Sequence, residues 1–164
     1  MSFSLRPKYY IESLLSLTPQ MLKERGIDLL VLDLDNTVSP YDEQYPTEAV
    51  LSWTEDMKQG GIQLYFVSNS KKIRPDVFAK AMDIPFIKHA RKPSPKYIRK
   101  AAEDTGVPLS RTALAGDQIF TDVLGANLAG VSSVLVRPIK FTNPFLALRY
   151  YVEMPFRITV KYKL

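Results

Sequence analysis

Short apolar runs alternate with amphipathic stretches along most of the chain. Four of the runs are rich in Val, Ile and Leu and have the length of strands that are buried on both faces. They extend from Ile27 to Leu34, Gln63 to Val67, Thr112 to Ala115 and Ser133 to Val136, and Pro85-Phe86-Ile87 is a weaker fifth. Runs of this kind are typical of parallel strands inside a sheet.

The stretches between the runs have the pattern of helices. Several begin near Pro, Ser or Thr, and two end just before Gly106 or Gly130, which are common start and stop signals. The predicted helices are Pro46 to Gln59, Pro75 to Met82, Ser94 to Thr105 and Thr121 to Leu128, with an opening helix over Ile11 to Arg25 that Gly26 closes. Strands that alternate with helices predict an open α/β sheet with right-handed crossovers.

Length and composition agree with this prediction. The chain has 164 residues, of which 46% are hydrophobic and 24% charged, as in an ordinary globular domain. We expect one domain over residues 1–164, with an N-terminal helical segment at 1–26 and a basic, aromatic segment at 141–164. The N-terminus lacks the apolar run of a signal peptide, and no stretch has the length of a membrane span, which predicts a cytoplasmic protein.

The sequence also limits the chemistry that the chain can perform. It contains no cysteine and a single histidine, His89. Thiolate catalysis and cysteine-based metal sites are therefore excluded, and one imidazole cannot build a histidine-rich metal site. Any metal must be a hard cation with oxygen ligands.

A pair of acids follows the first predicted strand, in Asp33-Leu34-Asp35-Asn36-Thr37. Two carboxylates at the end of so apolar a strand repel each other and resist burial unless a cation or a shared proton compensates them. The carboxyl ends of parallel strands are also where such sheets place their chemistry. The plainer interpretation is a turn or a helix cap that begins at Asp35.

Two more predicted strands lead to residues suited to phosphate. The second ends before Ser68, whose hydroxyl and the neighbouring amide of Asn69 could bind a phosphoryl oxygen or form an ordinary turn. Lys92 follows the weaker Pro85 to Ile87 run and precedes a helix, where it could neutralise a carboxylate nucleophile and the incoming phosphate. In isolation, the basic run around Lys92 is more typical of a solvated face.

The fourth predicted strand ends in Gly116-Asp117, and Asp122 follows five residues later. An acid at the end of a strand can complete an oxygen-only site for Mg²⁺. For Asp122 two interpretations remain open: it caps the following helix, or it holds the waters of the metal.

In this order the residues resemble the motifs of the haloacid dehalogenase (HAD) superfamily, which are Asp-x-Asp-x-Thr, a Ser or Thr, a Lys and a terminal acidic motif. The resemblance covers residues 33–122 and implies a three-layer, Rossmann-like α/β core with a central parallel sheet. It also implies a phosphatase in which Asp33 forms an aspartyl-phosphate, Asp35 protonates the leaving oxygen and then activates water, and Lys92 completes the catalytic set.

The resemblance implies Mg²⁺ as cofactor, held by Asp33, the Asp35 carbonyl and Asp117. The remaining motif positions are implied to bind substrate, and they are Asn36, Thr37, Ser68 and Asn69. Only 32 residues separate Asp35 from Ser68 and 23 separate Ser68 from Lys92, too few for a large cap domain. We therefore expect an open site that suits a large or surface-bound phosphorylated substrate, and Arg74, Arg91 and Lys96 are candidates for contacts with a second phosphate.

More narrowly, the motif spellings and the short length resemble the YqeG-type phosphatases of HAD subfamily IIIA, a group similar to mitochondrial phosphatidylglycerophosphate phosphatases. This resemblance implies a phospholipid substrate. The last 30 residues hold six basic residues and one acid, and so account for the whole net charge of +5. A helix over Pro144 to Met154 would group Phe145, Leu148 and Val152 along one side.

Two interpretations of this tail remain open. It packs on the domain with its charges in water, or it meets an anionic membrane as a peripheral contact at the inner face. No nucleic-acid-binding motif accompanies the charge, so we expect no nucleic-acid partner.

Three other functions compete with a lipid phosphatase. A soluble phosphatase for a nucleotide, sugar phosphate or phosphoprotein would use the same residues, and a non-catalytic HAD-fold scaffold would keep the fold for binding alone. A phosphoacceptor receiver domain needs an isolated acid at the end of a strand between Asp35 and Ser68, and the sequence has none there.

Overall fold

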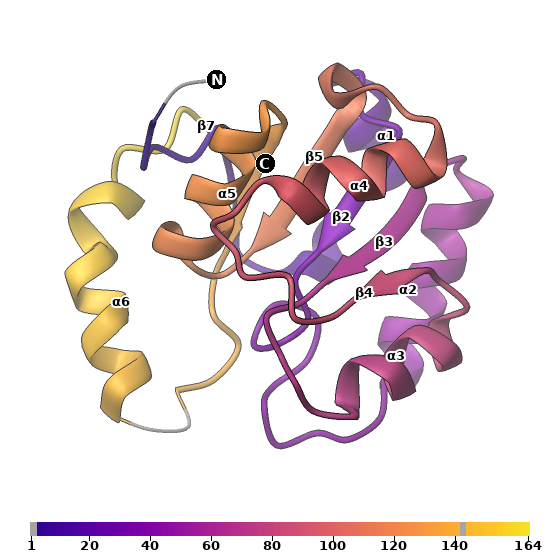
Figure 1. Ribbon diagram of the computed structural model, residues 1–164, viewed down its shortest axis with the longest axis horizontal. Coiled ribbons are helices and arrows are strands. Elements are labelled where there is room, and N and C mark those ends of the chain that lie inside the picture. The colour runs from indigo at the N-terminus through magenta and orange to yellow at the C-terminus, as the bar shows by residue number, and fades with distance from the viewer. Residues whose placement is uncertain (1–2, 142–143) are drawn as a thin grey trace.

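The computed structural model describes residues 3–141 and 144–164, and the strands in these ranges form one parallel sheet (Figure 1). The strand order across the sheet is β4-β3-β2-β5-β6-β1-β7. The strands are β1 (Tyr9–Ile11), β2 (Leu29–Leu32), β3 (Gln63–Val67), β4 (Phe86–Ile87), β5 (Thr112–Gly116), β6 (Ser132–Val136) and β7 (Tyr162–Lys163). All five predicted strands are present, and β2 lies near the centre of the sheet.

Helices pack on both faces of the sheet because β2 is apolar on both sides. Leu30 and Leu32 are buried in a cluster with side chains of α1, α2 and α3, whereas Leu29 and Val31 are buried with side chains of α4 and α5. The helices are α1 (Pro19–Lys23), α2 (Glu48–Gln59), α3 (Arg74–Met82), α4 (Lys96–Thr105), α5 (Leu124–Ala129) and α6 (Pro144–Arg157). The molecule thus has the predicted three-layer α/β architecture.

Shorter turns connect these elements. They are the 3₁₀ turns η1 (Leu14–Ser16) and η2 (Leu109–Arg111) and the π-helical turn η3 (Ile119–Val123). Gly106 and Gly130 end α4 and α5 in the left-handed conformation that glycine adopts without steric cost, as the sequence predicts.

The predicted opening helix over Ile11 to Arg25 is wrong in its first half. Tyr9–Ile11 is instead a strand that pairs with β6 on one side and β7 on the other, and helical structure is limited to η1 and α1. The side chain of Thr18 caps α1 by accepting a hydrogen bond from Met21 N at 3.2 Å. The sequence did not predict this strand, because three residues are too few to show the alternation of apolar and polar positions that marks a strand. Its partner strands also lie more than 120 residues away in the sequence.

The C-terminal segment adds α6 and β7 to the domain. The predicted helix over Pro144 to Met154 is confirmed and continues to Arg157, and α6 lies at one side of the molecule beside η3 (Figure 1). Within residues 3–141 and 144–164, no helix has both the length and the hydropathy needed to cross a bilayer.

Candidate active site

Three neighbouring parallel strands bring the predicted site residues to one edge of the sheet. β2 lies between β3 and β5, and the residues that follow these strands are Asp33, Ser68 and Asp117. All three residues are buried. The in-register pairing of these strands therefore places the ends of three distant motifs side by side, at the carboxyl edge where α/β proteins bind ligands.

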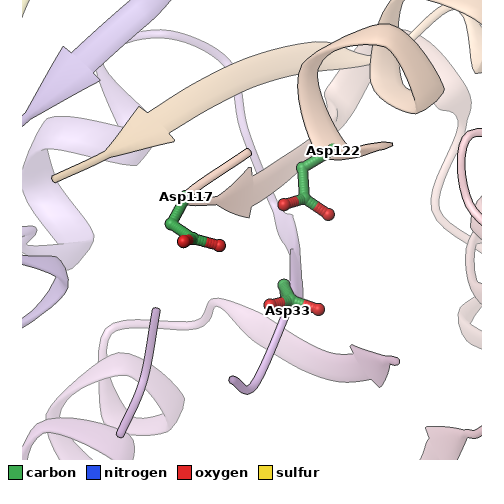
Figure 2. A group of neighbouring side chains, drawn as sticks. All are labelled: Asp33, Asp117 and Asp122. Carbon is green, nitrogen blue, oxygen red and sulfur yellow. The ribbon is translucent and has the colours of Figure 1, made fainter. Parts of the chain in front are cut away.

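The carboxylates of Asp33, Asp117 and Asp122 lie close together. Figure 2 shows them turned toward a common space, and one oxygen from each lies within 4.8 Å of the others. Gly116 permits this approach, because a Cβ atom there would lie 2.3 Å from Asp122 Cγ. A glycine is thus needed at position 116, because the side chain of Asp122 packs against the end of β5.

Lys92 provides the cation inside this cluster. Its Nζ lies 2.5 Å from Asp33 Oδ1 and 2.7 Å from Asp122 Oδ1. Burial disfavours the charged lysine, but the charges of Asp122 and Asp33 outweigh this effect and raise the pKa of Lys92 above its usual value. Lys92 is therefore a permanent ammonium that neutralises and orients the proposed nucleophile.

Asn69 holds this lysine in place. The Asn69 carboxamide accepts a hydrogen bond from Lys92 N at 2.6 Å and donates one to Lys92 O at 3.1 Å. Both polar atoms of the Asn69 side chain are thus hydrogen-bonded to Lys92. Only the backbone amide of Asn69 can make the predicted contact with substrate. Sequence reasoning missed this positioning role because nothing in a Ser-Asn dipeptide indicates a partner 23 residues away.

One ammonium does not balance three buried carboxylates. Burial raises the pKa of Asp33 to about 7, since the effect of Lys92 is opposed by the charge of Asp122. Burial and the charges of Asp122 and Asp33 raise the pKa of Asp117 well above its ordinary value. Buried Asp117 Oδ1 has no hydrogen-bond partner among the described residues, so the cluster suits a hard cation such as Mg²⁺.

Asp122 contributes to the cluster from η3. Its Oδ2 accepts a hydrogen bond from Gln118 N at 3.1 Å, while its Oδ1 contacts Lys92. The first contact caps the turn that begins after Gln118, which is one of the two roles that the sequence left open. Asp122 Oδ1 has no hydrogen-bond partner among the described residues, so Asp122, like Asp33 and Asp117, has an oxygen that a cation could bind.

Asp35 does not join the acidic cluster but pairs with Arg74. The guanidinium contacts Asp35 Oδ1 directly and donates to the carbonyl oxygens of Glu43, at 2.5 Å, and Pro40, at 2.6 Å. Arg74 is 4% exposed, so the prediction that it contacts a second phosphate is wrong: the residue fixes Asp35 and the loop after β2. Its position 39 residues from Asp35 gave no signal of this pairing.

The other motif residues are buried and mostly engaged by the backbone. Asn36 has a φ of 66°, and its Oδ1 accepts a hydrogen bond from Lys140 N at 2.9 Å. Asn36 Nδ2 and Thr37 Oγ1 are buried without a partner among the described residues, whereas the Ser68 hydroxyl accepts from Ser70 N at 3.1 Å. That these residues bind substrate stays a prediction.

The site is more enclosed than the spacing suggested. Tyr41 is partly buried near the acids, whose charges join with burial to raise its pKa, so it remains a phenol. On the side of Asp117, a cavity of about 10 Å³ separates the site from Arg149 and Tyr150 of α6. Residues 3–141 and 144–164 contain no large cap domain, but α6 covers part of the site on the side of Asp117.

The tail also holds the loop that carries Asp117. Arg157 donates to the Asp117 carbonyl and pairs with Glu153 at 2.7 Å, and Glu153 accepts from Phe120 N at 3.4 Å. Glu153 and Arg157 are 0% and 8% exposed. The sequence indicated basic character in the tail, but it could not show that one of these charges supports the acidic motif.

Comparison with known proteins was made for both sequence and structure. The family model described as HAD-hydrolase-like matches residues 89–144. Over 140 residues the chain is 35% identical to a Bacillus subtilis (strain 168) protein named "Probable phosphatase YqeG", covering 85% of this chain and 81% of that protein.

Solved structures share the fold at low sequence identity. One is the cobalt-bound deoxy-D-mannose-octulosonate 8-phosphate phosphatase of Haemophilus influenzae, with a TM-score of 0.60 and 15% identity over 87% of this chain and 80% of that chain. Another is the 3-deoxy-D-manno-octulosonate 8-phosphate phosphatase of Moraxella catarrhalis in complex with magnesium and phosphate ions and the sugar, with a TM-score of 0.58 and 17% identity over 90% and 82%.

Mg²⁺ should stabilise the chain in a pH-dependent manner. Raised carboxyl pKa values mean that the folded state holds protons more tightly than the unfolded state, so stability falls as pH rises from about 4 to about 7. Mg²⁺ at ten times its dissociation constant should add about 1.4 kcal/mol above pH 7 and little near pH 5, where protons compete for the acids. Thermal unfolding measures the difference, and Asp117→Asn should remove the response; an equal Mg²⁺ effect at both pH values would contradict this account.

Gly116→Ala should destabilise the domain by about 1–3 kcal/mol, because its methyl group overlaps Asp122, which Lys92 holds in place. Urea unfolding measures the loss, and a double-mutant cycle with Asp122→Ala provides the control. The loss should shrink when Asp122 is truncated. Strictly additive losses would show that the overlap is not the cause.

Proposed function

This chain belongs to the HAD superfamily and is a phosphatase, and from that premise we propose that it hydrolyses phosphomonoesters with Mg²⁺ through an aspartyl-phosphate on Asp33. The observation that carries the proposal is the contact of Lys92 with Asp33, next to the unpaired oxygen of Asp117. An ammonium beside the nucleophile reduces its repulsion from a phosphate dianion. A purely structural ion pair between Lys92 and Asp33 would not require a second and a third buried acid beside it.

In the first proposed step, an Asp33 carboxylate oxygen attacks phosphorus and forms a new P–O bond. The bond to the leaving oxygen breaks, and this oxygen keeps the electron pair and takes a proton from Asp35. In the second step water attacks the phosphorus, Asp35 accepts its proton, and the Asp33 carboxylate is released with inorganic phosphate. Splitting the displacement in this way avoids direct attack of water on an unactivated monoester.

Asp33 and Asp117 would hold Mg²⁺, with the Asp35 carbonyl as the third predicted protein ligand. The ion would supply positive charge to the phosphoryl oxygens. The chain contributes the remaining parts: Lys92 orients Asp33, Asn69 orients Lys92, and Arg74 keeps Asp35 at the mouth of the site. The Ser68 hydroxyl and the Asn69 amide are proposed to bind the transferred phosphoryl group.

For the substrate we propose phosphatidylglycerophosphate. The support is the resemblance to YqeG-type phosphatases and the basic, aromatic tail next to the site. The main alternative is a soluble phosphomonoester, such as the sugar phosphates named for two of the solved neighbours. A scaffold without catalysis is the alternative of another class.

Phosphate release decides between these functions. We expect the purified chain to release phosphate from phosphatidylglycerophosphate in mixed micelles when Mg²⁺ is present, and to lose all turnover with EDTA or with Asp33→Asn, which keeps the side-chain shape without the nucleophile. Asp35→Asn should lower kcat by about 10² to 10⁴. Turnover of soluble esters alone would exclude the lipid substrate. Absence of any Asp33-dependent turnover would contradict catalysis and favour the non-catalytic scaffold.

Arg74→Lys should lower kcat by roughly tenfold or more with little change in KM, because lysine cannot reproduce the fork that joins Asp35 to two carbonyls. In an Asp35→Asn background the same substitution should cost little, since the group that it positions is already lost. Thermal unfolding of each variant separates this effect from loss of fold. A full, additive loss in the double variant would show that Arg74 does not act through Asp35.

A further inference from the structure

The helix α6 has its polar and apolar faces reversed. Its charged residues Glu153 and Arg157 are 0% and 8% exposed, and they point into the domain. Phe145, Leu148 and Tyr151 are 69%, 62% and 69% exposed. A helix on the surface of a globular protein normally buries its apolar stripe and exposes its charges.

The outer face of α6 is apolar along its whole length. Residues three and four apart lie on the same side of a helix, and none of the fully exposed residues of α6 is charged. The one half-buried charge, Arg149, lines the small cavity that Asp117 also lines. Its exposed side chains are Pro144, Phe145, Leu148, Tyr151, Val152 and Pro155. Such a continuous exposed stripe marks an interaction surface rather than scattered surface apolar residues.

The helix cannot turn to bury this stripe. Arg157 is held by the Asp117 carbonyl and by Glu153, and Glu153 in turn accepts from Phe120 N. A rotation that buried Phe145 would leave two charged groups without their partners. The inner face of α6 is therefore fixed against the loop after β5, and the apolar outer face stays exposed to solvent or to a partner.

The apolar surface continues beyond the helix. Phe141, which is 49% exposed, packs edge-on against Tyr150, and Tyr150 packs against Tyr151, with ring centroids 5.2 Å and 6.0 Å apart. Ile158, just after the helix, is 75% exposed. The exposed apolar surface thus extends from an aromatic residue before α6 to an aliphatic residue after it.

Basic residues lie at both ends of the same segment. Lys140, which pairs with Asp42 at 2.5 Å, precedes α6, and Lys161 and Lys163 follow it, all exposed. The single acid of the last 30 residues, Glu153, faces inward. An apolar stripe with cations at its ends and no acid on its outer side complements an anionic, partly apolar surface.

We propose that the outer face of α6 docks on the surface of an anionic lipid bilayer, with the helix in the plane of the interface. The exposed side of α6 is a single apolar helix face, and amphipathic helices lie in the plane of a lipid interface with such a face buried in it. Phe145, Leu148 and Val152 enter the acyl boundary, while Lys161 and Lys163 meet the lipid headgroups. Because Arg157 of the same helix holds Asp117, docking places the catalytic edge beside the bilayer.

Vesicle co-sedimentation of the full chain tests this surface without any turnover. The chain should sediment with phosphatidylcholine vesicles that contain phosphatidylglycerol, and much less with phosphatidylcholine alone. Phe145→Ser with Leu148→Ser should weaken binding about tenfold or more. Lys100→Ser with Glu103→Ser, two exposed positions on α4, alters another helix without changing net charge and should leave binding intact.

A second pair of variants tests the charges. Lys161→Glu with Lys163→Glu should also weaken binding to anionic vesicles, whereas Lys80→Glu with Lys100→Glu, which changes net charge equally on α3 and α4, should weaken it less. Thermal unfolding of each variant serves as the check of folding.

The outcomes are distinct. Absence of binding by the wild-type chain, or equal binding by the Phe145 and Leu148 variant, would overturn the proposal. A wild-type dimer in light scattering that this variant converts to a monomer, without vesicle binding, would assign the face to a second copy of the chain and also overturn it. The proposed chemistry fails separately, through loss of Asp33-dependent phosphate release, whatever the vesicles show.

Discussion

The contact between the Lys92 ammonium and the buried acids is the constraint on which the rest of the site depends. A carboxylate desolvated at the end of a central strand is costly unless a cation compensates it. Lys92 offsets part of this cost for Asp33 and Asp122, and the remaining charge keeps the pKa of Asp33 and Asp117 high. The same excess of negative charge that destabilises the cluster of carboxylates suits it to bind a hard cation.

Much of the supporting structure serves to maintain this contact. Asn69 bonds the backbone of Lys92 from the end of β3, Gly116 lets Asp122 approach β5, and Arg157 fixes the Asp117 peptide from the tail. Each support comes from a different part of the chain. The parallel sheet matters because it brings these parts to one edge with their register set.

Local patterns were enough to predict the central strands, the helices and the order of the acidic and basic motifs. The apolar run that ends at Asp33 and the Gly116-Asp117 pair can each be recognised from a few consecutive residues. The contacts of Arg74 with Asp35, of Asn69 with Lys92 and of Arg157 with the Asp117 carbonyl could not be predicted in this way, because each joins residues more than 20 positions apart. The strand β1 was missed for the same reason: three residues become a strand only when β6 and β7 are present on either side.

The position of β1 between β6 and β7 has a consequence for how the molecule is made. Tyr9 pairs with Val134 on one side and with Tyr162 on the other, so β1 is flanked by two strands only after residues more than 120 positions later have been added to the chain. The Asp117 peptide likewise receives Arg157 only after the last helix has formed. The acidic cluster and its lysine, Asp33, Lys92, Asp117 and Asp122, therefore all precede in the order of synthesis the helix whose Arg157 fixes the Asp117 peptide.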